Sequence, residues 1–128
     1  MASESRKLIT IRDLEGVVSP HDGTVKRAME VRKKFLEGFE DVAGLARHIG
    51  GNLESLALGE TWAIKKEFFP GIEIHFVFAG GDNEFPSSLR VLFSGANIRG
   101  MHGEDMADAA IFIANYMVEY VQKARSRL

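Results

Sequence analysis

Two short stretches of the chain concentrate side chains that can bind ligands or metal ions. In segment 80–86, Gly-Gly-Asp-Asn-Glu-Phe-Pro, the carboxylates of Asp82 and Glu84 follow a pair of glycines. Further along the chain, His102 precedes Glu104 and Asp105. Histidine nitrogens and carboxylate oxygens are ligands for hard and borderline metal ions. If the fold brings the two stretches together, these five side chains form a candidate metal site.

Both stretches also have structural interpretations. The glycines permit a tight turn, and Asp82 can accept hydrogen bonds from backbone N–H groups in an Asx turn. Carboxylates in the first turn of a helix are stabilised by its exposed N–H groups and dipole, typically by about 0.3 to 1 kcal/mol. The spacing His-x-Glu-Asp matches no established metal motif. The sequence favours the structural interpretation of both stretches and leaves the functional one open.

Two residues in expected strands are further ligand-binding candidates. Large apolar residues alternate along segment 72–78, so His75 points to the opposite face of the sheet, together with Glu73. A hydrogen-bonded, structural histidine is the alternative to a ligand-binding one. Trp62, the only tryptophan, can stack on a planar ligand or pack in the core or at an interface. With Asp82 and Glu84, these two complete the set of candidate ligand-binding residues.

Motifs for covalent or phosphate chemistry are missing from the sequence. It contains no Gly-x-Ser-x-Gly nucleophile motif, no phosphate loop ending in Gly-Lys-Ser/Thr and no Gly-x-Gly-x-x-Gly fingerprint. The chain has no cysteine, which excludes disulfides, thiolate metal sites and thiol nucleophiles within it. We therefore assign no catalytic residue and leave any cofactor open; the sequence favours a protein that is not an enzyme without excluding one.

Composition restricts the classes of partner. With 128 residues, 45% of them apolar, the chain has the size of one domain with its own core. A net charge of −2 gives no overall field that would attract nucleic acid. No apolar run approaches the roughly 18 residues of a membrane span, and the first residues lack the apolar core of a signal peptide. We expect a soluble, cytoplasmic protein without a nucleic-acid or membrane partner.

An α+β arrangement must position the candidate residues. Residues 1–22 are expected to form a strand or an arm, with the strand at 8–11. Residues 23–50 have helical spacing of apolar side chains in two parts, with Gly38 ending the first helix and Asp41 capping the second. The outer face of the first helix carries a basic cluster interrupted by Glu30 and Glu37, which is typical of a solvated surface: Lys26, Arg27, Arg32, Lys33 and Lys34.

Short β-like runs follow the two helices and predict an antiparallel sheet over residues 53–94. The runs are 56–58, 61–69, 72–79 and 88–94. Pro70 and Gly71 stand where a type II turn needs them, which favours a hairpin between the second and third runs. Residues 104–124 are expected to form a long helix that is apolar nearly all round. One face of that helix would pack on the sheet, and the rest predicts a homodimer through this helix.

A set of short motifs in the second half of the chain resembles a known family. These motifs are Phe69-Pro70, the Gly-Asp-Asn-Glu-Phe-Pro of residues 81–86, Leu92-Phe93 and Glu104-Asp105. In this order they are similar to domain of unknown function family 3786, an uncharacterised family of anaerobic bacteria and archaea. The chain departs from the family pattern at Ser94, where an Asp is expected, so a ligand role of that Asp would be lost here.

The resemblance implies an α+β fold similar to PAS-like sensor domains, and it implies no activity. Three functions remain open. The first is a non-enzymatic small-molecule-binding or sensory module of a PAS-like kind. The second is a metal-dependent enzyme or metal-binding protein that uses Asp82 and Glu84 with the residues around His102. The third is an accessory subunit of an anaerobic metabolic complex, whose partner covers the apolar last helix.

Overall fold

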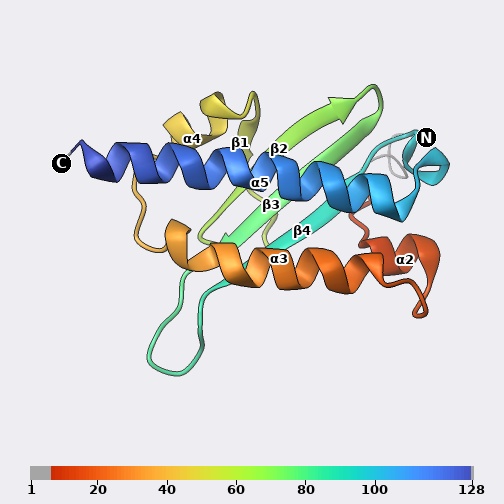
Figure 1. The fold of residues 1–128 in the computed structure, drawn as a ribbon, viewed down its shortest axis with the longest axis horizontal. Coiled ribbons are helices and arrows are strands. Elements are labelled where there is room, and N and C mark those ends of the chain that lie inside the picture. Colours follow the sequence, from red (N-terminus) through yellow and green to blue (C-terminus); the bar gives the residue numbers. More distant parts are fainter. Residues whose placement is uncertain (1–6, 128) are drawn as a thin grey trace.

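A layer of helices covers one face of a four-stranded antiparallel sheet in the computed structural model, which describes residues 7–127. The strands are β1 (Asn52–Glu54), β2 (Trp62–Phe69), β3 (Ile72–Ala79) and β4 (Ser88–Ser94), in the order β1-β2-β3-β4. The long helices α3 (His21–Leu36) and α5 (Gly103–Ser126) run side by side across the sheet (Figure 1). The α+β class, the antiparallel sheet and the long C-terminal helix agree with the sequence prediction.

Three strands lie where the alternation of side chains predicts them, but the first does not. Residues 56–58, expected as a strand, form a loop, and the shorter β1 pairs with β2 instead. The cause is Glu60, whose carboxylate accepts hydrogen bonds from the N–H groups of Leu56 (2.5 Å) and Leu58 (2.7 Å). Between them Ala57 has a φ of 57°. These amides are therefore used within the loop and not in a strand ladder.

The turn between β2 and β3 is formed by Pro70 and Gly71, as the sequence predicts. Gly71 has a φ of 73°, which favours glycine. The backbone of Gly95 packs against this turn with a φ of 127°, and a Cβ atom there would collide with the carbonyl group of Gly71. Asn97 fixes the same corner, because its side chain donates to the carbonyl oxygen of Pro70 at 2.9 Å.

The segment before α3 differs from the expected strand at 8–11. Ile9 makes a single antiparallel bridge to Phe93 on β4, and the helix α2 (Ile11–Glu15) begins immediately afterwards. Thr10 caps this helix in a reciprocal arrangement, since its hydroxyl accepts from the N–H of Asp13 and the Asp13 carboxylate accepts from the N–H of Thr10. This capping box turns the chain into a helix after one bridging residue.

The predicted second helix is α4 (Val42–His48), capped by the Asp41 side chain, which accepts from the N–H of Gly44 at 3.0 Å.

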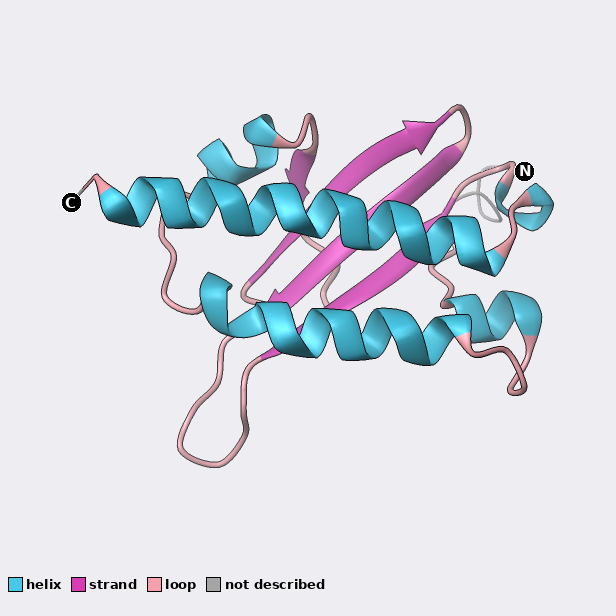
Figure 2. Cartoon of the chain, in the orientation of Figure 1, coloured by secondary structure: helices cyan, strands magenta, loops and turns pink. Residues whose placement is uncertain are grey.

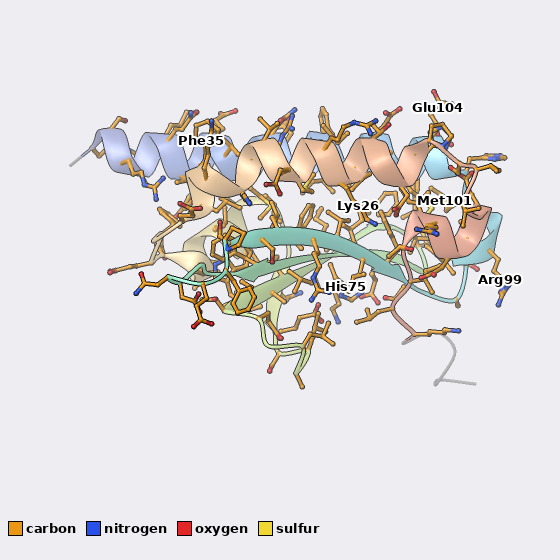
Figure 3. The ribbon with its side chains drawn as sticks, turned by 90° about the horizontal axis from the view of Figure 1, so that it is seen from below. Lys26, Phe35, His75, Arg99, Met101 and Glu104 are labelled. Atoms are coloured by element: carbon orange, nitrogen blue, oxygen red, sulfur yellow. The ribbon has the colours of Figure 1, made fainter. Side chains whose placement is uncertain are left out.

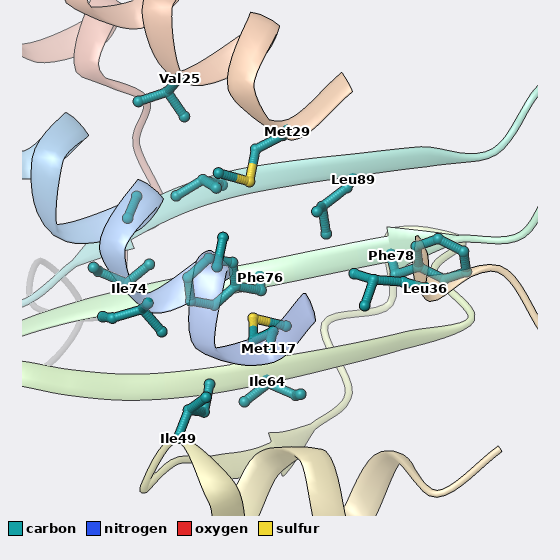
Figure 4. Packing of buried hydrophobic residues seen from close by; sticks show 14 of the residues in the cluster. Val25, Met29, Leu36, Ile49, Ile64, Ile74, Phe76, Phe78, Leu89 and Met117 are labelled. Atoms are coloured by element: carbon teal, nitrogen blue, oxygen red, sulfur yellow. The ribbon is translucent and has the colours of Figure 1, made fainter. Parts of the chain in front are cut away.

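The core lies between the helices and one face of the sheet, which Figure 2 shows as two layers. Figure 4 shows apolar side chains from both layers meeting there. Phe76, Ile74 and Ile64 of the central strands are fully buried, as are Met117 of α5 and Leu45 of α4. Within residues 7–127, no helix is long and apolar enough to cross a membrane.

Candidate functional site

The loop between β3 and β4 is held by Asp82. Its Oδ1 atom accepts hydrogen bonds from the N–H groups of Glu84 and Phe85, both at 2.8 Å. These two bonds, with that from Phe85 the stronger influence, lower the pKa of Asp82 below its ordinary value. Gly81 is needed because a Cβ atom there would lie 2.6 Å from the backbone nitrogen of Ser87. Asp82 therefore holds the turn, and Glu84 is exposed beside it.

A cavity of about 440 Å³ lies beneath this loop, between it and the C-terminal end of α3. Phe78 and Phe85 contribute apolar walls, and Lys33, Glu37 and Ser87 contribute polar groups. Phe85 is 67% exposed, which is unusual for a side chain of its size. The cavity opens to solvent and has the dimensions of a small-molecule site. It thus combines a cation, a carboxylate, a hydroxyl group and an exposed aromatic ring.

Hydrogen bonds tie the polar side of this cavity to α3. Lys33 Nζ donates to the carbonyl oxygen of Ser87 at 2.9 Å and forms an ion pair with Glu30 at 2.7 Å. The Ser87 hydroxyl donates to Glu37 Oε1 at 2.5 Å. The sequence predicts a solvated basic surface that includes Lys33. Its side chain is only 15% exposed, so Lys33 does not belong to such a surface. These contacts fix the positions of the polar groups that line the cavity.

Trp62 lies behind the cavity and does not face it. Its ring stacks on that of Phe78 with 5.2 Å between ring centroids and an interplanar angle of 20°. Trp62 is 9% exposed and belongs to the core cluster, as the packing interpretation predicts. Its indole supports the cavity wall through Phe78, so any effect of Trp62 on a ligand would be indirect.

The two candidate groups of metal ligands do not meet. Asp82 and Glu84 precede β4, whereas His102, Glu104 and Asp105 follow it at the other end of the sheet (Figure 1). The seven residues of β4 separate those ends by about 20 Å, at about 3.3 Å per residue. Among the residues that the structure describes, no group of three or more His, Asp and Glu side chains is arranged to hold a metal ion. A single ion shared by both groups is therefore incompatible with this fold.

The first turn of α5 is already occupied by a carboxylate from another helix. Glu15 Oε2 accepts from the N–H of Gly103 at 2.8 Å, and Glu15 Oε1 accepts from His21 Nδ1 at 2.9 Å and from Ser19 Oγ at 2.7 Å. The bonds from His21, then Ser19 and Gly103, lower the pKa of Glu15 to about 2. His102, Glu104 and Asp105 are exposed around this capped end, as Figure 3 shows for Glu104.

His75 lies on the side of the sheet away from the helices (Figure 3), where it joins a chain of polar groups. Its Nδ1 atom lies 2.5 Å from Glu54 Oε1, and its Nε2 atom lies 2.6 Å from Ser94 Oγ. The Ser94 hydroxyl also lies 3.5 Å from Glu73 Oε1, and Glu73 is paired with Lys65 at 3.5 Å. All polar side-chain atoms that are buried in the described part of the chain have hydrogen-bond partners.

The chain of Ser94, His75 and Glu54 resembles the nucleophile, base and orienting carboxylate, in that order, of acyl-transfer enzymes. Two observations argue against that chemistry. Ser94 is only 2% exposed and lies in a strand paired with β3, so a substrate carbonyl cannot approach its hydroxyl. A second carboxylate, Glu73, lies 3.5 Å from the serine hydroxyl, where its negative charge would repel an oxyanion formed nearby. The arrangement is a satisfied hydrogen-bond chain, which agrees with the structural interpretation of His75.

Exposed aromatic residues mark the outer surface of α5. Phe112 is 61% exposed and Tyr116 45% exposed, and their rings meet edge to face with 5.1 Å between centroids. Tyr116 also lies 6.5 Å from the ring of His48 on α4. The inner face of α5 is buried against the sheet, so these rings form a separate apolar surface. We call Phe112, Tyr116 and His48 the α5 surface.

Several residues of these sites were missed by the sequence analysis. Glu54 was not expected near His75, because the strand that carries it lies outside the predicted runs. Lys33 and Glu37 were assigned to an exposed helix face, although they contact the loop after β3. The signal available in the sequence was that both residues lie near the end of α3. Hydrophobic spacing alone could not show that this end of the helix faces residue 87.

The fold and the cavity together define a small α+β protein with helices on one side of an antiparallel sheet and a solvent-open pocket at one end. The chain belongs to the family described as Domain of unknown function (DUF3786), whose model matches residues 2–116. This confirms the family resemblance of the sequence motifs. No curated protein and no solved structure matches the chain.

Proposed function

We propose that the protein is a non-enzymatic module that binds a small molecule in the cavity beneath the loop of residues 80–86. The observation that carries this proposal is the cavity of about 440 Å³ with prepositioned polar groups. Its Glu37 carboxylate can accept a hydrogen bond from a ligand, and the exposed ring of Phe85 can stack on a planar group. The chemistry favours a planar, polar ligand with a hydrogen-bond donor.

Thermal unfolding with a panel of planar polar compounds tests this proposal. Nucleobases, pyridine carboxamides and aromatic amines are suitable probes. A ligand at 100 times its Kd stabilises the folded state by about 2.7 kcal/mol, which raises Tm by roughly 10 °C in a chain of this length. Native mass spectrometry of freshly purified protein would show any ligand retained from the cell. The proposal is refuted if no compound raises Tm and the purified protein carries none.

Two matched variants locate the site. Phe85→Ala removes the exposed ring at the cavity and is expected to abolish the rise in Tm. Phe69→Ala removes an exposed ring at the opposite end of the sheet, beside the Pro70-Gly71 turn, and should leave the rise unchanged. If Phe69→Ala removes the effect and Phe85→Ala does not, the ligand binds elsewhere and the assignment of the cavity is wrong.

We also propose a homodimer through the α5 surface, supported by the exposed rings of Phe112 and Tyr116. Sedimentation equilibrium should give twice the chain mass for the wild type and the chain mass for Phe112→Glu. An accessory-subunit role in an anaerobic metabolic complex predicts instead that the isolated chain is a monomer with this surface covered by a different protein. The two proposals therefore differ in the mass of the isolated chain.

The finer features expected from the family resemblance belong to the same proposal. A sensory role similar to that of PAS-like domains is supported by the antiparallel sheet with helices on one face and by a cavity at the end of that layer. A single-domain organisation over residues 1–128 and a cytoplasmic location are likewise proposed. Localisation of a tagged chain by cell fractionation tests the last of these.

A further inference from the structure

The outer edge of β4 carries backbone groups that can pair with another strand. Ile9 already pairs there, because its N–H and C=O exchange hydrogen bonds of 2.8 Å with Phe93. Outward-facing residues alternate along an antiparallel strand, so Val91 and Leu89 also direct their N–H and C=O groups to this edge. Apart from the Ile9 pair, the hydrogen bonds of the described residues include none to these outward groups.

Both ends of this open edge are closed by the protein itself. At one end, the capping box at Thr10 turns the chain into α2 after the single bridge at Ile9. At the other end, Lys33 donates to the carbonyl oxygen of Ser87. The open stretch of β4 is therefore short, about five residues, and it begins where an existing antiparallel pairing stops.

A groove of about 430 Å³ runs along this stretch between β4 and α3. Its inner wall is apolar, with Val25 and Met29 of α3 above Leu89 and Val91 of β4. Figure 3 views this side of the molecule, with α3 above the sheet. A strand added to β4 would direct alternate side chains into the groove and the others to the opposite face of the sheet. The groove thus favours apolar side chains opposite Leu89 and Val91.

The charge of Arg90 restricts which strand can be added. Arg90 lies between those two residues, points to the open face of the sheet and is exposed, and no salt bridge of the described chain includes it. Pairing with β4 of a second copy, with Leu89 opposite Val91, would place two Arg90 side chains directly opposite each other. Like charges in that position are destabilising, whereas an acidic residue there is favourable.

We infer that the β4 edge binds an extended peptide segment of a partner protein by strand addition, with the pattern apolar-acidic-apolar. The apolar side chains enter the groove opposite Leu89 and Val91, and the acidic side chain pairs with Arg90. Main-chain hydrogen bonds supply the affinity, and the groove and the arginine supply the selectivity. This interaction is separate from the proposed ligand cavity and from the α5 surface.

The probe is a fluorescein-labelled peptide with the core Thr-Val-Glu-Val-Thr, whose antiparallel addition places the Glu opposite Arg90 and the two Val residues opposite Leu89 and Val91. Fluorescence anisotropy with the full chain should show saturable binding. Replacing the central Glu by Lys should weaken binding about two- to five-fold, as expected for an exposed cross-strand charge pair. The variant Arg90→Glu should invert this preference, so that the Lys peptide binds more tightly. A peptide methylated on both valine nitrogens should lose at least ten-fold, since those N–H groups pair with β4.

Amide hydrogen exchange distinguishes strand addition from other binding. The outward amides of Leu89 and Val91 should become protected by the peptide, whereas the Arg90 amide, which already faces β3, should change little. The inference is overturned if the peptide does not bind or binds without this alternating protection. It is also overturned if Arg90→Glu leaves the preference unchanged, or if the edge is covered by a second copy and its amides are protected without peptide.

Discussion

The hydrogen-bond chain around His75 can be tested by removing one hydroxyl group. Ser94→Ala deletes the partner of His75 Nε2, which lies 2.6 Å from Ser94 Oγ, and the His75 side chain is buried, with 4% of its surface exposed. Leaving a buried polar atom without a hydrogen-bond partner costs about 1 to 3 kcal/mol of unfolding free energy. With a urea m value of about 1.5 kcal/mol per M, a loss of about 2 kcal/mol lowers the unfolding midpoint by roughly 1.3 M.

Two further variants isolate the effect of this hydrogen bond. Ser88→Ala makes the same chemical change on the same strand at a half-buried serine, and should shift the free energy by less than about 0.5 kcal/mol. In a His75→Phe background, Ser94→Ala should cost less than in the wild type, with a coupling of about 0.5 to 3 kcal/mol. The reasoning is wrong if Ser94→Ala behaves like Ser88→Ala, or if its cost is the same with and without His75.

Three other changes address the turns and the start of α5. Gly95→Ala should lower the unfolding free energy by at least about 2 kcal/mol because its Cβ collides with the Gly71 carbonyl group. Gly38→Ala, also at positive φ but in open space, should cost about 1 kcal/mol in urea unfolding, and equal costs would contradict this reasoning. Because the pKa of Glu15 is lowered from 4.5 to about 2, its carboxylate stabilises the folded state above pH 4.5, and this stability is lost as the pH falls toward about 2. Glu15→Gln should therefore make Tm less dependent on pH over that range, and an unchanged dependence of Tm on pH would contradict this role of Glu15. Asp82→Ala removes an acceptor of two backbone N–H groups, so those amides should exchange with solvent faster by NMR while global stability stays within about 0.5 kcal/mol; unchanged exchange would show that Asp82 does not hold the turn.

Local patterns predicted the elements whose causes are local. Alternating apolar side chains mark β3, and Pro70-Gly71 fixes the hairpin before it, so both were placed correctly. The strand expected at 56–58 failed because Glu60 binds the amides of that segment. The strand expected at 8–11 ended early because Thr10 and Asp13 form a capping box, a signal that is visible in the sequence but was outweighed by apolar residues.

The candidate site divides in the same way. The role of Asp82 follows from the turn preferences of its own segment and could be predicted. The cavity could not, since it needs Glu37 to meet Ser87 across 50 positions of sequence. His75 was placed on the correct face of the sheet, but its partners Glu54 and Ser94 lie 21 and 19 positions away. Contacts of that range depend on strand register and helix placement, which side-chain periodicity does not determine.

The contacts between the two ends of the chain also affect how it folds during synthesis. Ile9 pairs with Phe93, and Glu15 caps Gly103 across 88 positions of sequence. The first helices leave the ribosome well before residue 103 is synthesised. The contacts of α3 with β4 and α5, and those of α2 with α5, therefore form only after these later elements have been made. Such late pairing slows folding and leaves apolar surface exposed on the nascent chain. We therefore expect the chain to need its C-terminal helix, and the protection of chaperones, before its N-terminal third becomes stable.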